Sequence, residues 1–188
     1  MKKYWDSVEI GHKLKVAPKK PITRLQIARF AAACDDFSPM GLDEEYAKSA
    51  GLGSVYAPGI IALGIIEEGL KTFAQNMSIT TLSTTFQRLI WPCDVLSAKG
   101  VIVRRYRKND EHRVQFSVWV ENQNGDVVVK GQAICLLFKN AQEESHLGSE
   151  KEPQLSQASY AELVKRCEQV TNRRPAQKTT KVPQKEIA

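Results

Sequence analysis

An acidic segment, CDDFSPMGLDEEYA at residues 34–47, contains residue types that general acid–base chemistry uses. Asp36 and Asp43 provide carboxylates on either side of Pro39. A carboxylate can take a proton from water, but such reactions commonly need a second group that donates one, and histidine most often fills that role. Gly41 stands where we would expect the histidine. The segment therefore predicts an acid–base site that lacks one member.

The three histidines of the chain, His12, His112 and His146, all lie outside this segment. We expect them in an N-terminal turn, at the approach to a strand and in a linker, where a histidine is usually a solvated surface residue. Two other polar residues of the segment have structural interpretations. Ser38 is expected to hold a turn, and Asp43 to cap the helix that follows it.

Three helices are predicted to position this segment. The first begins at Thr23, whose hydroxyl can cap the helix and is followed three residues later by Gln26, as in a capping box. The second is predicted over 43–50, with acidic residues in its first turn and Gly51 after its end. The third begins with Pro58 and is so rich in apolar residues that we expect burial on most of its circumference.

From Ile79 onward the pattern changes to that of antiparallel strands. Apolar and polar residues alternate over 114–120, which is typical of a half-buried strand. Asn124 and Gly125 form a hairpin signal that joins this strand to the segment 126–138. A buried helix followed by antiparallel strands predicts the α+β class.

Composition indicates a single globular domain with an extension. The chain has 188 residues, 42% hydrophobic and 26% charged, and no apolar run long enough for a membrane helix, so we expect a cytoplasmic protein with no membrane partner. Residues 139–188 are predicted to form a polar linker and a disordered basic tail, with a short helix possible at 156–170. The net charge of +6 includes a basic excess past Thr171, and without an aromatic platform or a binding module we expect no nucleic-acid partner.

The segment PITRLQIARFAAACDDFSPMGLDEEYAKSAGLGSVYAPGIIALGIIEEGL resembles the N-terminal half of MaoC-like hot-dog proteins. These include the (R)-specific enoyl-CoA hydratases and 3-hydroxyacyl-thioester dehydratases, which are lyases of fatty acid metabolism. TTFQRLIWPCDVLSAKG resembles the strand and turn that follow, and the resemblance covers roughly residues 5–138. It implies a single hot-dog domain at 1–138, in which an antiparallel sheet wraps a long central helix.

Two motifs carry the resemblance. The family pattern GDxNPxHxD corresponds here to Asp36, Ser38, Pro39, Gly41 and Asp43, so that glycine replaces the histidine. The family pattern AHGM corresponds to Ala57, Pro58, Gly59 and Ile60, so that proline replaces the histidine. The histidine positions of both motifs are therefore altered.

The resemblance implies an acyl-thioester site at a dimer interface. Asp36 would act on water, and the amide of Gly59 would hold the thioester oxygen. The substrate would be a thioester of coenzyme A or acyl carrier protein, with no cofactor and no metal. Because Gly41 cannot titrate, we expect weak hydratase or dehydratase activity, or a non-catalytic subunit. The partner is expected to be a second copy or another hot-dog chain that supplies aspartate and histidine.

Two alternatives stay open. One is a hot-dog thioesterase that uses Glu67 or Asp36, since Glu67 lies eight residues after Gly59 as the thioesterase carboxylate does. The competing interpretation has Glu67 facing solvent or a partner, with Lys71 as its ion-pair partner one helical turn later. The other alternative is a non-enzymatic scaffold or interaction protein.

A basic group at the end of a predicted strand offers a further substrate contact. Arg104 and Arg105 lie before a predicted turn at Asn109 and Asp110. They could bind the phosphates of coenzyme A or the surface of a carrier protein. The competing interpretation is a solvated strand end.

Overall fold

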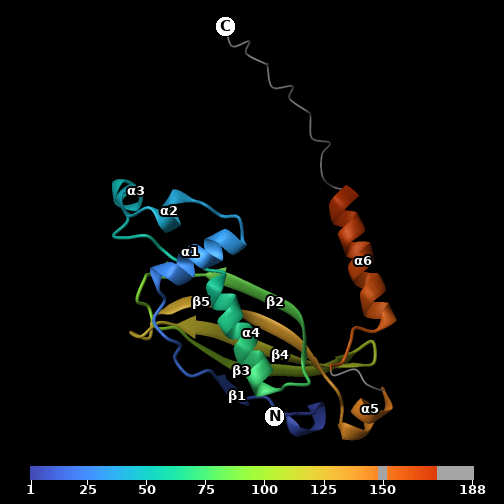
Figure 1. Cartoon of the computed structure of the whole chain (residues 1–188). Coiled ribbons are helices and arrows are strands. Elements are labelled where there is room, and N and C mark those ends of the chain that lie inside the picture. The colour runs from blue at the N-terminus through green and yellow to red at the C-terminus, as the bar shows by residue number, and fades with distance from the viewer. Residues whose placement is uncertain (148–151, 173–188) are drawn as a thin grey trace. The chain divides into compact units, whose positions relative to one another are not determined.

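A five-stranded antiparallel sheet with strand order β1-β3-β4-β5-β2 is the scaffold of the molecule (Figure 1). The computed structural model describes residues 1–147 and 152–172. The strands are β1 (Lys13–Lys15), β2 (Ser78–Phe86), β3 (Ser97–Lys108), β4 (Glu111–Glu121) and β5 (Val127–Leu137). Because β1 and β2 have a sheet neighbour on one side only, both are edge strands within the single chain.

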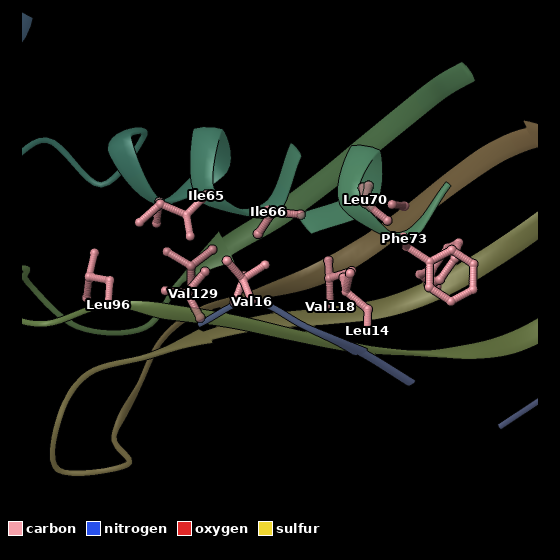
Figure 2. Packing of buried hydrophobic residues seen from close by; sticks show 14 of the residues in the cluster. Leu14, Val16, Ile65, Ile66, Leu70, Phe73, Leu96, Val118 and Val129 are labelled. Atoms are coloured by element: carbon pink, nitrogen blue, oxygen red, sulfur yellow. The ribbon is translucent and has the colours of Figure 1, made fainter. Parts of the chain in front are cut away.

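Helix α4 (Ile61–Phe73) lies across one face of the sheet (Figure 1). Its buried face includes Ile66 and Leu70, which are 0% exposed and pack on Val118 and Val129 of the sheet in the core (Figure 2). The opposite face is open, and Ile60, just before the helix, is 52% exposed. Our expectation of burial on most of the circumference was therefore wrong for the single chain, because the sheet covers only one side of the helix.

Three shorter helices precede α4: α1 (Arg24–Ala33), α2 (Pro39–Leu42) and α3 (Glu44–Ser49). The predicted capping box at the start of α1 is present, since Thr23 accepts from the Gln26 amide at 3.1 Å and Gln26 accepts from the Thr23 amide at 2.8 Å. Asp43 caps α3 as predicted, by accepting from two backbone amides of the first turn. Local side-chain chemistry therefore defines where α1 and α3 begin.

Tight turns connect the long strands. Asn109 and Asp110 both have positive φ, 52° and 63°, as in the type I′ turn that suits a two-residue hairpin between β3 and β4. The predicted hairpin between β4 and β5 is also present, with Gly125 at φ 81°. These turns set the register of the sheet.

The N-terminal segment packs against the end of the sheet. A 3-10 helix, η1 (Trp5–Ser7), follows Tyr4, whose hydroxyl donates to Glu144 at 2.9 Å. Glu144 belongs to α5 (Ala141–His146), which follows β5 where the sequence had indicated a linker. Glu144 is 9% exposed and also accepts from Lys2 at 2.9 Å, so two hydrogen bonds join the N-terminal segment to the helix that follows β5.

His112 contradicts the expectation of a solvated histidine. Its side chain is only 7% exposed and packs on the ring of Trp5, with centroids 5.1 Å apart. Burial lowers the pKa of His112 below the ordinary 6.5. The physical reason is that η1 folds back over the start of β4, a contact that no local pattern indicates.

The compact unit Met1–Gln154 contains every element from η1 to α5, and a second unit begins at Leu155. The second unit contains α6 (Gln157–Asn172), close to the range 156–170 where a short helix was expected. The expected basic tail falls largely on 173–188, outside the described residues. Among the described helices, none has the length and apolar content that crossing a membrane requires.

Candidate functional site

A small cavity lies where α1, α2 and the approach to α4 meet. Its volume is about 90 Å³. It is lined by Ile27, Ala31, Asp36, Ser38, Gly41, Leu42, Tyr56 and Pro58. Four of these are motif positions singled out in the sequence, namely Asp36, Ser38, Gly41 and Pro58. The structure therefore brings together residues from two motifs that are about 20 positions apart in the chain.

The C-terminal end of α1 positions Asp36 at this cavity. Asp35 adopts the left-handed conformation, with φ 54°, directly after the last turn of the helix. The Asp36 amide then donates back to Ala31 at 2.9 Å, and the Asp35 amide to Ala32 at 3.4 Å. These two bonds form a Schellman motif, which ends a helix and reverses the chain direction. The position of Asp36 is therefore determined by the end of α1.

Asp36 and Ser38 are also linked to each other. Asp36 Oδ1 accepts from the Ser38 amide at 3.2 Å, as in an Asx turn. The carboxylate thus stabilises the turn before α2 and lines the cavity at the same time. The structural and chemical interpretations of Asp36 are compatible, since one carboxylate oxygen is enough for the turn.

Gly41 is not required by the backbone. Its φ is not among the positive values of the described glycines, and a Cβ added there would lie 3.5 Å from the Tyr56 carbonyl oxygen, an ordinary contact distance. A residue with a side chain could therefore occupy this position. Because Gly41 lines the cavity, a side chain at this position would border the same space as Asp36.

The start of α4 differs from the prediction. Pro58 was expected at the first helical position, but α4 begins at Ile61, and the intervening residues form a turn in which the Ile61 amide donates to Pro58 at 3.0 Å. Within residues 1–147 and 152–172 the Gly59 amide makes no hydrogen bond. That amide therefore keeps a donor that an acceptor oxygen could use.

Glu44 fastens the helices around the cavity. Its Oε2 accepts from Arg24 at the start of α1, from the Ser54 hydroxyl at 3.0 Å and from the Val55 amide at 3.4 Å. Partial desolvation opposes ionisation of Glu44, but these bonds and Lys48 outweigh it and lower its pKa from 4.5 to about 2. The ionised carboxylate ties α1, α3 and the chain before Tyr56 together.

Glu67 does not join the cavity. It lies on the exposed face of α4, eight residues after Gly59, which is about 12 Å along a helix. Its expected partner Lys71 instead binds Glu152 and donates to the Met77 carbonyl at 3.1 Å. Glu67 therefore faces outward from the chain, away from the residues of the two motifs.

The two arginines lie far from the cavity within one chain. Phe86 contacts Gly59 and pairs with Val129 of β5. Arg105 pairs with Val114 of β4, which in turn pairs with Cys135 of β5. Val129 and Cys135 are six residues apart along β5, which is about 20 Å. Arg105 donates to the Trp5 carbonyl and stacks on its ring, while Arg104 is exposed above Tyr106.

Sequence reasoning missed four residues that line the cavity. Ile27 and Ala31 are one helical turn apart on α1 and both are buried, but the capping box that predicted this helix says nothing of what its buried face borders. Leu42 lies in α2, a four-residue helix that was not predicted. No sequence pattern pointed to Tyr56. All four depend on contacts between segments that are distant in sequence.

The arrangement can hold a small uncharged group. The walls contributed by Ile27, Ala31, Leu42 and Pro58 are apolar, and Asp36 and Ser38 provide the polar atoms. In the part of the chain that the structure describes, no three His, Cys, Asp or Glu side chains come together as metal ligands require. The chemistry available at the cavity is that of a carboxylate, hydroxyls and backbone amides.

A central helix packed on one face of a five-stranded antiparallel sheet, with a polar loop and a cavity before the helix, defines a hot-dog fold. The MaoC like domain family matches residues 6–124. The chain therefore belongs to the MaoC-like dehydratase family. No curated protein matches it significantly.

Solved structures show the same fold at low sequence identity. A monoamine oxidase regulatory protein from Archaeoglobus is 24% identical with a TM-score of 0.67, over 74% of this chain and 96% of that one. The R-hydratase PhaJ1 from Pseudomonas aeruginosa is 24% identical with a TM-score of 0.64, over 73% and 86%. A chain of the 3R-hydroxyacyl-ACP dehydratase complex HadBC from Mycobacterium tuberculosis is 17% identical with a TM-score of 0.62, over 70% and 98%.

Proposed function

We propose that this chain is an acyl-thioester-binding subunit of the hydratase and dehydratase type that does not complete the reaction alone. One observation carries the proposal: Asp36, Ser38, Gly41 and Pro58 line a single cavity, and no histidine of the chain does. All three histidines lie in the described part of the chain. His12 precedes β1, His112 is buried beside Trp5 and His146 ends α5.

The chemistry requires three functions. In hydration of an enoyl thioester, a base takes a proton from water as its oxygen bonds to C3, and an acid protonates C2. The negative charge that develops on the thioester oxygen needs a hydrogen-bond donor. Asp36 can serve as the base and the Gly59 amide as the donor. The proton donor is missing, and loss of such a group commonly lowers the rate about 100-fold to 10,000-fold.

A partner subunit fits the open side of the fold. Edge strand β2 has nine residues without a charge or a proline, and an edge of that kind pairs readily with another strand. The open face of α4 exposes Glu67, and Ile60, just before the helix, is exposed as well. Heterodimers of hot-dog chains occur among the structural relatives, including HadBC. We therefore propose a second hot-dog subunit that supplies the aspartate–histidine pair, with a second copy of this chain as the alternative.

Crotonyl-CoA hydration tests the catalytic part of the proposal. At saturating crotonyl-CoA, where weaker binding caused by the larger side chain does not limit the rate, the kcat of the purified protein is expected to be at least about 100-fold lower than that of its Gly41→His variant. Gly53→His is the matched control, because Gly53 is exposed, has no atom within 4 Å of an added Cβ and lies outside the cavity. Adding Asp36→Asn to Gly41→His should abolish the gain. Equal hydration by the wild type and Gly41→His would contradict the proposal.

The same preparations test the other candidate functions. Release of coenzyme A that disappears in Glu67→Gln or Asp36→Asn would establish a thioesterase instead. The absence of acyl-CoA binding as well as of both activities would favour a scaffold. Native mass spectrometry of the protein from its own source distinguishes a homodimer from a complex with a second hot-dog chain.

A further inference from the structure

One of the residues that line the cavity, Gly41, has no side chain. Gly41 and the Tyr56 backbone both border the cavity, and an added Cβ would project to within 3.5 Å of the Tyr56 carbonyl oxygen. Neither a positive φ nor a close backbone approach accounts for this glycine. A side chain at this position is therefore sterically allowed, and the glycine takes up no space beside Asp36.

We propose that this cavity receives the end of a short, uncharged acyl chain of about four carbons, so that the chain selects short-chain acyl thioesters. The proposal rests on the acyl-thioester function argued above and specifies its substrate class. A cavity of about 150 Å³ holds the six carbons of benzene, so the 90 Å³ here hold about four. The rest of an acyl-CoA must lie outside.

The composition of the walls supports an uncharged ligand. Ile27 and Ala31 are 1% and 4% exposed and give the cavity an apolar wall. Leu42 is 39% exposed and lies nearer the surface. Asp36 borders the same space, so a ligand ending in a carboxylate would place two negative charges together in a partly apolar site. A saturated or enoyl hydrocarbon end avoids that repulsion.

Binding of saturated acyl-CoAs to the full-length protein tests the length limit, because these compounds cannot be hydrated. Each methylene buried in the cavity should tighten binding about fourfold, so butyryl-CoA is expected to bind about 15-fold more tightly than acetyl-CoA. From hexanoyl- to octanoyl-CoA the affinity should no longer rise. A steady fourfold gain per methylene up to octanoyl-CoA would overturn the assignment. Failure of every acyl-CoA to bind would instead overturn the proposed function.

Two variants with matched controls identify the cavity. Gly41→Ala fills about one carbon's volume and should lower the ratio of butyryl-CoA to acetyl-CoA affinity about fourfold. Gly53→Ala, with open space around the added Cβ, should leave both affinities unchanged. Leu42→Ala should let the affinity keep rising to hexanoyl-CoA, whereas Leu25→Ala on the exposed surface of α1 should not. An unchanged length profile in Gly41→Ala and Leu42→Ala would overturn the assignment.

Succinyl-CoA tests the requirement for an uncharged end, since its acyl group also has four carbons. It is expected to bind at least about tenfold more weakly than butyryl-CoA, and Asp36→Asn should reduce that difference. Equal binding of succinyl- and butyryl-CoA by the wild type would show that the acyl end does not reach Asp36 and would overturn the assignment.

Discussion

The ring of Phe86, at the end of β2, lies against the Cα of Gly59 at the entry to α4. A Cβ on Gly59 would be 2.6 Å from Cδ1 and 2.8 Å from Cε1 of that ring, far inside contact distance. Phe86 is 54% exposed, so the ring has room to move outward. This contact joins the edge strand of the sheet to the residue whose amide we propose as the oxyanion donor.

Gly59→Ala is predicted to destabilise the protein by up to about 1 kcal/mol, because the exposed Phe86 ring must move outward. In a Phe86→Ala background the same substitution should cost less, since the clash is absent. Chemical denaturation of the four proteins of this double-mutant cycle gives the coupling energy. Additive effects would show that the ring does not restrict residue 59.

Asp35→Gly should stabilise the protein by up to about 1 kcal/mol. Asp35 occupies the left-handed position of the Schellman motif, where a Cβ is unfavourable and glycine is not. The greater freedom of glycine in the unfolded chain offsets part of this gain. Asp35→Ala is the control, because it keeps the Cβ and loses the polar side chain, and it should not stabilise. A loss of stability in Asp35→Gly would contradict this account of the loop before Asp36.

Glu44→Gln should lower the Tm at neutral pH, since an amide replaces the ionised acceptor that Arg24 and Ser54 share. The pKa of Glu44 is about 2 in the folded protein and near 4.5 when unfolded, so its stabilising effect is complete above 4.5 and is lost as the pH falls toward 2. The Tm difference between wild type and Glu44→Gln should therefore shrink over that range. Glu45→Gln is the control, because in the described structure this neighbouring side chain has no hydrogen bond. A Tm difference that stays constant down to pH 2 would contradict the stabilising role of ionised Glu44.

The parts of the site that could be predicted from sequence are those set by neighbours in the chain. The Thr23 capping box and the Asp43 cap depend on residues three positions apart, and both are present. Pro58 was placed three residues too early because the turn before α4 is stabilised by a backbone bond rather than by a side-chain signal. The roles of Asp36 and Gly59 in catalysis remain proposals.

What sequence patterns did not indicate are contacts between distant segments. Ile27 and Tyr56 are 29 positions apart, yet both line the cavity, because α1 folds back over the entry to α4. Trp5 covers His112 for the same reason at the other end of the sheet. Neither pairing follows from periodicity or capping, since both arise from the packing of whole elements.

The buried His112 predicts a loss of stability in mild acid. Burial lowers its pKa, and the positive charges of Arg107 and Lys139 act in the same direction, while Glu143, 3.8 Å away, and Asp6 oppose them. The unfolded chain, with an ordinary pKa of 6.5, therefore binds a proton before the folded protein does. The contribution of neutral His112 is complete above pH 6.5 and decreases as the pH falls below it.

Replacing His112 tests this directly. His112→Phe keeps a ring against Trp5 but cannot titrate, so the free energy of unfolding should depend less on pH between 7 and 5 than in the wild type, as measured by urea denaturation at each pH. His146→Gln, on the exposed end of α5, should retain the wild-type dependence. Equal losses of stability on acidification in His112→Phe and the wild type would contradict this prediction, because protonation of His112 would then have no measurable cost.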